Sequence, residues 1–479
     1  MNRPNILLIT TDQQRFDTIA ALGNSHIFTP HLNWLTDEGT SFVRCYADCP
    51  ICMPSRATIM TGKRGYTTGC VGNNGDLLPM RTQKETLPYL LTQNGYQTRG
   101  VGKMHFEPAW ANYGFEHIDL DLNYYREMAQ HPEWGIPKDH GTGENEVEPV
   151  ISTVHESYSL TQWTVKHSID FLETRDPTRP FFLWTSFTKP HPPLDPCFHY
   201  WALYEDEDMP DPVLGDWSAD LATMPKGYLR ITYWLNNMQR FSPRQMKKIR
   251  RAYYALITQI DYSLGLLFAR VRELGLLENT WIIFTSDHGD MLGDHHMGAK
   301  FVFQEGASHV PLIIRPPMAA GKIHEMSGKR CQRLVEMADL FPTILSMAGL
   351  SVPQDADGVN LLDHLQDNRT TPFFGNVENH IFCVMEGYEK YLWTAFGGAE
   401  LLFDLKEDPY EQHNLACLPE YQDKMEYYRK LLIGHMKQTG VTEHIKGDTL
   451  IPVEAPKDTH DIAKWPGFHS PKVEIDTLH

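Results

Sequence analysis

NILLITTD, from Asn5 to Asp12, is the stretch that decides the fold. Apolar side chains in succession lead into a polar Thr-Thr-Asp, and a short apolar run of this kind is typical of a strand buried on both faces of a parallel sheet. Four later segments have the same form: Gln97–Val101, Pro180–Phe187 (PFFLWTSF), Trp281–Ser286 (WIIFTS) and Pro311–Arg315 (PLIIR). The sequence therefore predicts a set of buried parallel strands.

Helical signals lie between these runs. Ser242 is a good N-cap and Pro243 suits the first helical position, so a helix is expected from there to residue 274, where Gly275 ends it. A second helix is expected from about Val335 to Gly349. Strands that alternate with helices imply a doubly wound α/β core.

The pattern changes after residue 350. Short strand-like pieces, Tyr391–Ala395 and Glu400–Asp404, precede a helix near Tyr421–Lys437. Such a succession predicts a small α+β unit packed on the first. We therefore expect a large domain over residues 1–350 and a small C-terminal domain with its tail over residues 351–479.

Composition and charge exclude several classes of function. Hydrophobic residues make up 41% and charged residues 22% of the chain, the balance of an ordinary globular protein. The net charge of −18 opposes long-range attraction to nucleic acid or to an anionic membrane, so any anion site must be a local cationic pocket. No segment approaches the roughly 18 apolar residues of a membrane span. The first apolar run is too short for a signal-peptide core, and we expect a cytoplasmic protein.

Cys49 and Cys52 form a C-x-x-C pair among eight scattered cysteines. Half of a zinc site is one interpretation, but no second C-x-x-C follows at finger spacing. A redox pair is another, but no thioredoxin-like βαβ pattern surrounds it. Both interpretations are disfavoured.

Polar and ionisable residues follow four of the apolar runs at the point where each run ends. They are Asp12 and Gln13, Lys103 and His105, Lys189 and His191, and Asp287, His288 and Asp290. In open α/β sheets, ligands bind beyond the carboxyl ends of the strands. One such residue could simply begin a loop, but four groups together predict a site with metal-ligand or acid–base chemistry.

The segment CPICMPSRATIMTGKR, from Cys49 to Arg64, resembles the signature C-x-P-S-R followed by T-G-x-R of the sulfatase family. The alternative is a buried, inert Cys52 before a helix that starts at Pro54, but the Pro, Ser, Arg and Thr-Gly residues all fit the signature. A second stretch, DLKEDPYEQHNLA from Asp404 to Ala416, resembles the closing domain of sulfatases.

This resemblance implies both a fold and a nucleophile. The fold would be that of alkaline phosphatase and the sulfatases: a large mixed sheet flanked by helices, then a smaller C-terminal α+β domain with an antiparallel sheet. Cys52 would be oxidised to formylglycine by a maturation enzyme that recognises the Pro and Arg. Hydrated formylglycine is a geminal diol, and the amino end of a helix favours an anionic group there.

By the same resemblance, the metal ligands would be Asp12, Gln13, Asp287, His288 and the modified Cys52. Many sulfatases carry a second Asp at the position of Gln13 and an Asn at the position of His288. The Asp-Gln and Asp-His pairs look more like choline sulfatases and phosphonate monoester hydrolases. Oxygen-rich ligation fits Ca²⁺, while the histidine also admits Mn²⁺, and Mg²⁺ is a further alternative.

Residue roles follow from the same matching. Arg56 and Lys103 would hold the formylglycine and the metal cluster. His105 would take a proton from the second hydroxyl of the sulfated intermediate and so regenerate the aldehyde.

Other cationic residues would act on the substrate. His191 and Lys300 would bind sulfate oxygens and protonate or polarise the leaving alcohol. Lys189 and His309 are weaker candidates for substrate binding, since a solvated charge or a core histidine explains them equally well.

The expected reaction is hydrolysis of a sulfate ester. A sulfated mono- or oligosaccharide is the preferred substrate class, followed by choline sulfate or an aryl sulfate. Specificity loops would be Asn123–Val150, predicted as a long surface loop, and Phe198–Leu235. Aromatic residues on these loops could stack on a sugar or pack under the loops: Trp134, Trp201, Trp217, Tyr233 and Trp234. Two alternatives stay open, a phosphonate monoester or phosphodiester hydrolase and an unconverted metal-binding protein.

Overall fold

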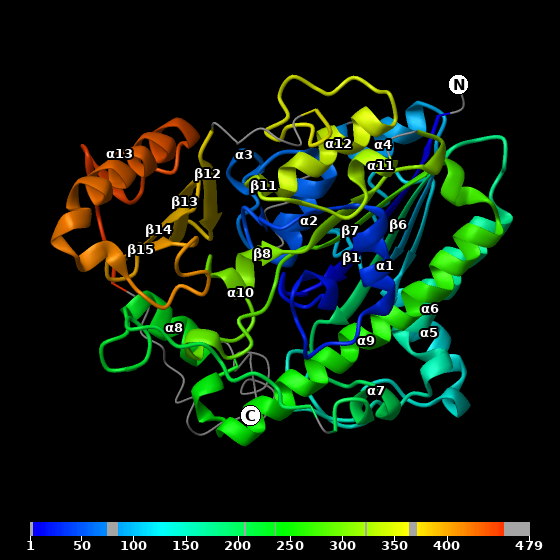
Figure 1. The fold of residues 1–479 in the computed structure, drawn as a ribbon, viewed down its shortest axis with the longest axis horizontal. Helices are drawn as coiled ribbons and strands as arrows, with labels where there is room; N and C mark the ends of the chain where they lie inside the picture. Colours follow the sequence, from blue (N-terminus) through cyan, green and yellow to red (C-terminus); the bar gives the residue numbers. More distant parts are fainter. Residues whose placement is uncertain are drawn as a thin grey trace.

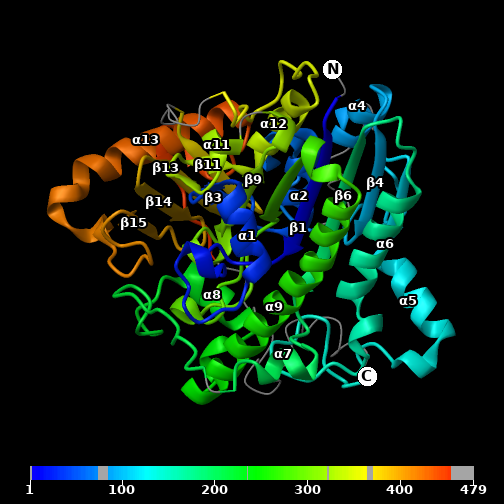
Figure 2. The ribbon, with the colours of Figure 1, turned by 45° about the vertical axis from the view of Figure 1, so that its right-hand side comes forward.

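The computed structural model describes residues 3–73, 85–205, 207–234, 236–320, 323–363 and 371–454. Within these residues the largest sheet has eight strands, and its helices lie on both faces (Figures 1 and 2). In spatial order the strands are β10 (Lys329–Cys331), β2 (Thr40–Phe42), β9 (Leu312–Arg315), β7 (Thr280–Ser286), β1 (Asn5–Asp12), β6 (Phe181–Pro190), β4 (Gln97–Gly102) and β5 (His117–Leu120). The large mixed sheet between helices confirms the predicted fold class.

Strand β1 lies inside the sheet and is buried along its whole length. It pairs in parallel with β6 on one side and with β7 on the other. Because side chains alternate along a strand, Ile6 and Leu8 face one layer of helices while Leu7 and Ile9 face the other. The first layer contains α2 (Cys52–Thr61), α4 (Leu87–Gln93) and α12 (Leu340–Met347), and the second contains α1 (Pro30–Glu38), α6 (Leu160–Thr174) and α9 (Pro243–Glu273).

The direction of one predicted strand was wrong. Pro311–Arg315 forms β9, but it runs antiparallel to both β7 and β2. A parallel partner for β7 would need a crossover helix between the two strands. Between β7 and β9, the chain instead forms a 3-10 turn, the one-turn helix α10 (Glu305–Ser308) and the two-residue strand β8 (His309–Val310), and it returns antiparallel.

Helix α9 confirms its predicted start and end. The Ser242 side chain accepts the backbone N–H of Gln245, and the Gln245 side chain accepts the backbone N–H of Ser242, which completes a capping box. Neither α9 nor any other helix in the described part of the chain is long and apolar enough to cross a membrane.

Two other predictions of secondary structure need correction. The segment from Val335 begins as strand β11 (Val335–Glu336) and a 3-10 turn, and only then becomes α12. Val335 and Glu336 pair with β3 (Cys45–Tyr46), so a tertiary partner overrides the helical pattern. Asn123–Val150 is not all loop, because its first residues continue α5 (Asp121–Gln130).

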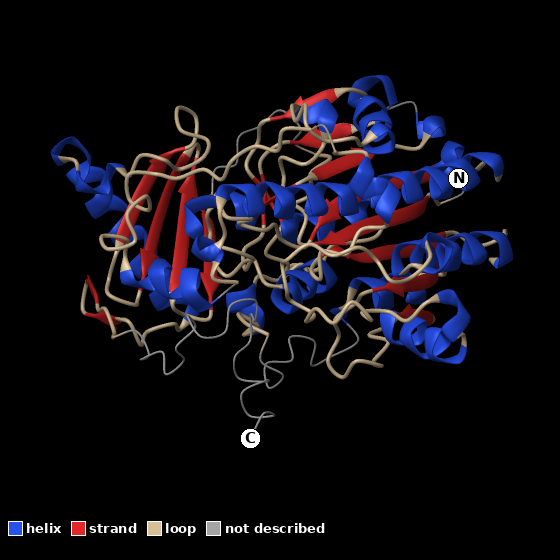
Figure 3. Cartoon of the chain, turned by 90° about the horizontal axis from the view of Figure 1, so that it is seen from below, coloured by secondary structure: helices blue, strands red, loops and turns tan. Residues whose placement is uncertain are grey.

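The C-terminal part contains an antiparallel sheet beside the main sheet (Figure 3). Its strands are β12 (Phe373–Val377), β13 (Ile381–Glu386), β14 (Glu389–Thr394) and β15 (Glu400–Asp404), and helix α13 (Gln422–Thr439) covers one face. Phe382, Tyr391 and Trp393 point toward α13. The opposite face, including Leu392 and Phe403, packs against the first domain.

A buried ionic cluster joins the two parts of the chain. Lys390 of β14 is fully buried, and its Nζ lies 2.5 Å from Glu305 Oε1 and 2.9 Å from Glu411 Oε1. Glu305 also contacts His309 and Tyr46 of the first domain. Burial raises the pKa of Glu411, whereas Lys390 and His309 outweigh burial and lower the pKa of Glu305. One ammonium therefore holds two carboxyl groups from different parts of the sequence.

Replacing Lys390 with methionine should destabilise the protein by about 3–5 kcal/mol, because it leaves two buried carboxyl groups without their cation. Lys424→Met is the matched control, since Lys424 pairs with Glu389 at the exposed surface and should cost about 0–1 kcal/mol. Denaturant unfolding of both variants measures the difference. Equal losses of unfolding free energy in the two variants would show that the buried cluster contributes no more to stability than an exposed ion pair.

Candidate active site

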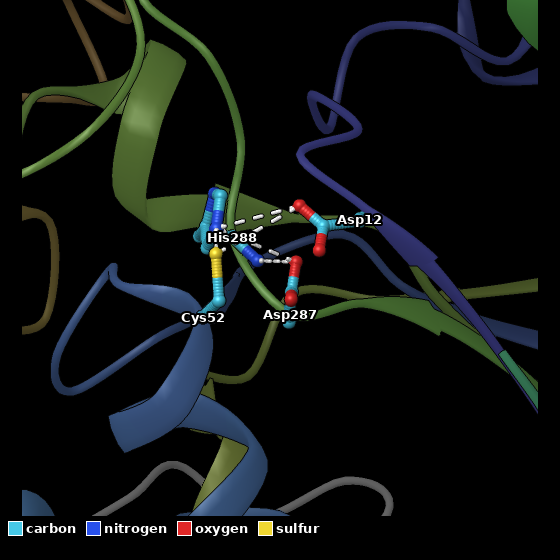
Figure 4. A group of neighbouring side chains, drawn as sticks. All are labelled: Asp12, Cys52, Asp287 and His288. Carbon is cyan, nitrogen blue, oxygen red and sulfur yellow. Dashed lines mark hydrogen bonds and ion pairs between the residues drawn. The ribbon is translucent and has the colours of Figure 1, made fainter. Parts of the chain in front are cut away.

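Four strand ends and one helix start meet at a single edge of the main sheet. Asp12 ends β1, Asp287 follows β7, Lys103 follows β4 and His191 follows β6. Cys52 is the first residue of α2, and its side chain points at the carboxylates of Asp12 and Asp287 (Figure 4). The predicted convergence of strand ends is therefore observed.

Asp12, Cys52, Asp287 and His288 form a buried cluster whose potential ligand atoms all lie within 4.8 Å of one another. The Nε2 atom of His288 is 3.2 Å from Cys52 Sγ, 3.8 Å from Asp12 Oδ1 and 3.6 Å from Asp287 Oδ1. Two carboxylates, an imidazole and residue 52 are a donor set that suits a divalent cation.

The orientation of His288 fits metal ligation. Its Nδ1 lies 2.9 Å from the carbonyl oxygen of Gly289, which fixes the proton on Nδ1 if this contact is a hydrogen bond. The lone pair of Nε2 then faces the cluster. Metal-ligating histidines typically donate their other ring N–H to a carbonyl or carboxylate in this way.

Arg56 holds both carboxylates of the cluster. Its Nε donates to Asp287 Oδ2 at 2.9 Å, and its Nη2 lies 3.3 Å from Asp12 Oδ2. The remaining Nη1 donates to the carbonyl of Lys103 at 2.5 Å and to Ser186 Oγ at 2.8 Å. Lys103 Nζ lies 2.6 Å from Asp12 Oδ2. The predicted supporting role of Arg56 and Lys103 agrees with these contacts.

The surrounding cations decide the charge of residue 52. Burial and Asp12 act to raise the pKa of the Cys52 thiol, but the ammonium groups of Lys300 and Lys103 help to lower it well below its usual range. The amino end of α2 adds to this preference for an anion. The position therefore stabilises negative charge.

Asp12 stays ionised for a similar reason. Burial acts to raise the pKa of its carboxyl group, but Lys103, His191, Lys300 and Arg56 lower it well below the usual value.

Lys300 lies beside Cys52 and also contacts Gln13. Lys300 Nζ donates to Gln13 Oε1 at 2.8 Å and to Cys52 Sγ at 3.2 Å. The backbone N–H of Gln13 donates to Asp287 Oδ1 at 3.1 Å. Gln13 therefore lies beside the cluster with its side-chain oxygen toward Lys300, and its role as a metal ligand stays a prediction.

His191 is buried beside the cluster, whereas Lys189 is turned away from it. Burial, Lys103 and Lys300 hold the pKa of His191 well below its usual value. Lys189 Nζ is bound by the Asp195 carboxylate and by the carbonyl of Pro193 at 2.6 Å. The prediction that Lys189 binds substrate is corrected, because its ammonium closes the turn after β6.

The other two predicted histidines have different surroundings. His309 binds Glu305 Oε2 through Nδ1 at 2.7 Å and the carbonyl of Val43 through Nε2 at 3.0 Å. With both ring nitrogens engaged, His309 is a core histidine and the prediction of substrate binding is corrected. His105 is exposed after β4, and its role in breakdown of the intermediate stays a prediction.

Three further residues support the site, of which the sequence pattern had marked only Asp290. Asp290 Oδ2 accepts from Gln13 Nε2, and Ser186 Oγ bridges Arg56 to the carbonyl of Lys103. Tyr253 of α9 donates its hydroxyl to the carbonyl of Gln13 at 2.5 Å. The polar cluster after β7 was a signal for Asp290, but no sequence pattern marks a tyrosine 240 residues from its partner.

The aromatic residues on the predicted specificity loops serve packing where the structure describes them. Trp217 is buried against Tyr228 and Phe403, and its Nε1 donates to the carbonyl of Glu411 at 2.7 Å. Trp134 stacks on His131 and Tyr158, and the ring of Trp201 lies under the Arg251 guanidinium. The side chains of Tyr233 and Trp234 lie outside the described residues.

Comparison with known proteins gives consistent results. The family model "Sulfatase" matches residues 4–350, and "N-sulphoglucosamine sulphohydrolase, C-terminal" matches residues 293–438. An arylsulfatase of Clostridium perfringens is 34% identical over 92% of this chain and 96% of its own length. An N-acetylglucosamine-6-O-sulfatase of Bacteroides thetaiotaomicron is 26% identical over 91% of this chain and 87% of its own. The crystal structure of a phosphonate monoester hydrolase of Agrobacterium radiobacter superposes with a TM-score of 0.79 at 25% identity, covering 93% of this chain and 98% of that one.

Proposed function

Because this chain belongs to the sulfatase family and is a sulfuric ester hydrolase, we propose that it cleaves the sulfate ester of a sulfated mono- or oligosaccharide with residue 52 as nucleophile. The observation that carries the proposal is the setting of Cys52. Its Sγ lies at the start of α2, 3.2 Å from both Lys300 Nζ and His288 Nε2. This setting favours an anionic oxygen on residue 52 and an anionic group bound beside it.

The nucleophile is formylglycine, made from Cys52 by a maturation enzyme. Its hydrate supplies one hydroxyl to attack sulfur and a second whose deprotonation releases sulfate. Arg56 and Lys103 hold Asp12 and Asp287 in place. Lys300 lies within reach of a sulfate oxygen carried on residue 52, and the protonated form of His191 would polarise or protonate the leaving alcohol through Nε2, because its Nδ1 lies 2.8 Å from the carbonyl oxygen of Pro192.

Asp12, Asp287, His288, Gln13 and residue 52 would hold a divalent ion, with Ca²⁺ preferred and Mn²⁺ or Mg²⁺ as alternatives. When bound, the ion neutralises sulfate oxygens and promotes ionisation of the diol. The four clustered donors and the orientation of His288, whose Nε2 faces the cluster, support this assignment. Gln13 would contribute its side-chain oxygen, which accepts from Lys300 Nζ.

The preference for a sulfated sugar rests on one family model and one relative. The C-terminal family model carries the name of a sulphoglucosamine sulphohydrolase, and one relative is an N-acetylglucosamine-6-O-sulfatase. Choline sulfate and aryl sulfates are the next candidates.

A phosphonate monoester or phosphodiester hydrolase is the second candidate function, because Gln13 and His288 occur where that class has the same residues and a solved member shares the fold. The deciding experiment compares kcat/KM for 4-nitrophenyl sulfate, 4-nitrophenyl phenylphosphonate and bis(4-nitrophenyl) phosphate. We expect the sulfate, or a sulfated glucosamine, to be the best substrate. A higher kcat/KM on the phosphonate than on every sulfate ester tested would reverse the order of the two functions.

His191→Ala and Lys300→Ala should each slow hydrolysis of a sugar sulfate by about 10²–10⁴-fold. The loss should be smaller for 4-nitrophenyl sulfate, because a nitrophenolate leaves without a proton. Steady-state kinetics on both substrates measures the ratio. His413→Ala and Lys166→Ala are matched controls on the exposed surface and should leave both rates unchanged.

His105→Ala should instead slow both substrates by a similar factor and let a sulfated enzyme accumulate, since it acts after the leaving group has departed. Quenched-flow mass spectrometry detects that species as added mass on the peptide that contains residue 52. If His191→Ala trapped the sulfated enzyme and His105→Ala showed the leaving-group dependence, the two histidines would have exchanged roles.

A further inference from the structure

Asp290 is a buried carboxylate that touches the site without belonging to the metal cluster. It is 2% exposed and lies just after the Asp287-His288 pair. Its Oδ1 accepts the backbone N–H groups of Leu292 at 2.8 Å and Ala299 at 2.9 Å. Its Oδ2 accepts Gln13 Nε2 at 2.6 Å. Every contact therefore uses Asp290 as an acceptor.

The backbone of Gln13 is already held in place by other groups. Its N–H donates to Asp287 Oδ1, and its carbonyl accepts the hydroxyl of Tyr253. The residue has a φ of 73°, which non-glycine residues seldom adopt. The remaining freedom is the side-chain amide, whose two ends have nearly the same shape and can exchange by a half-turn.

Donor and acceptor chemistry selects one of the two amide orientations. Asp290 can only accept, so the NH₂ end of Gln13 faces it, and Lys300 can only donate, so the oxygen faces Lys300. The reversed amide would set an NH₂ against an ammonium and an oxygen against a carboxylate. The same Lys300 ammonium then reaches Cys52 Sγ at 3.2 Å.

We infer that Asp290 is a positioning residue: it orients the Gln13 amide so that the amide oxygen accepts from the Lys300 ammonium and holds that ammonium against residue 52. As a contribution to catalysis, this role rests on the proposed function, because it concerns the residues that hold residue 52. Groups behind the direct ligands of a metal or nucleophile typically contribute about 10–100-fold in affinity or activity.

Asp290→Asn tests the role with almost no change of shape. To keep both backbone N–H bonds, the new side chain must keep its oxygen on Leu292 and Ala299, so its NH₂ faces Gln13. The Gln13 amide must then reverse or lose its partner. We expect kcat to fall about 10–100-fold with a smaller change in KM, and affinity for Ca²⁺ to fall in a calorimetric titration of the chelated protein.

A second substitution should repair the first. Gln13→Glu combined with Asp290→Asn gives an acceptor at position 13 that can serve both the new NH₂ and Lys300, and it keeps the total charge. Gln13→Glu alone should be damaging, because two carboxylates would face each other across the 2.6 Å contact. We expect the double variant to recover at least about tenfold in kcat over Asp290→Asn, a range within the contribution of such outer groups.

The two single variants and the double variant can also be compared by their Tm values, a measurement that needs no substrate. Each single variant should lower Tm, and the double variant should lie above both. Recovery in Tm without any hydrolysis of sulfate esters by the wild-type protein would uphold the amide orientation while refuting the proposed function. Additive losses in Tm, or wild-type kcat in Asp290→Asn, would overturn the positioning role.

Discussion

Replacing Cys52 with alanine should lower turnover by about 10⁶-fold, the scale of loss when a hydrolase loses its nucleophile. Cys52 is buried at the start of α2, where Lys300 and His288 both contact its sulfur. Alanine at this position can neither become formylglycine nor form a covalent intermediate. The fold should persist, because α2 keeps its buried face and its Gly62 C-cap.

Cys49→Ala is the matched control for this experiment. Cys49 is equally buried three residues earlier, but its thiol contacts only the carbonyl of Val71 among the hydrogen bonds found in the described residues. That variant should keep most of its activity. Intact-mass measurement of wild-type protein should show a loss of about 18 Da at residue 52, from replacement of the thiol by an aldehyde. Activity of pure Cys52→Ala close to that of wild type would refute the mechanism.

Removing the divalent ion should lower turnover by about 10³-fold or more, since such an ion contributes several kcal/mol of charge stabilisation. In the absence of the ion, the ion pairs of Asp12 and Asp287 are those with Arg56 and Lys103. Dialysis against a chelator, with metal content measured by elemental analysis, tests the loss. Adding back Ca²⁺, Mn²⁺ or Mg²⁺ separately should restore activity and identify the preferred ion.

A matched pair of variants ties the ion to the cluster. Asp287→Asn should weaken binding of the restoring ion, because it removes a charged donor. Asp261→Asn alters another fully buried carboxylate, which binds His31 and Leu32 away from the cluster, and should leave ion affinity unchanged. Full activity in a sample shown to be free of metal would contradict the assignment.

Much of the site followed from the sequence because its signals are local. The apolar run before Asp12 and the run before Asp287 predicted strands whose carboxyl ends lie together, and the two residues are neighbours in the structure. The segment around Cys52 carried its own signature. Arg56 was assigned to hold the cluster, and it contacts both carboxylates.

Other assignments could not be made from residue type and spacing. His288 and His309 are the same residue type, yet one faces the cluster and the other binds Glu305 and a carbonyl in the core. Lys189 and Lys300 are likewise the same residue type. The ammonium of Lys189 binds the Asp195 carboxylate, whereas the ammonium of Lys300 donates to Gln13 and Cys52.

The sequence by itself determined which segments are buried and where strands end in polar residues, and it predicted residue 52 as the nucleophile, because each of these signals depends on neighbours along the chain. Tertiary structure alone decided the antiparallel direction of β9. It also decided the ion pairs of Lys390 with Glu305 and Glu411 and the hydrogen bond of Gln13 with Asp290. Hydrogen bonds and ion pairs act only over a few ångströms. Their partners here lie up to 277 residues apart, so strand order and the packing of loops select which groups meet.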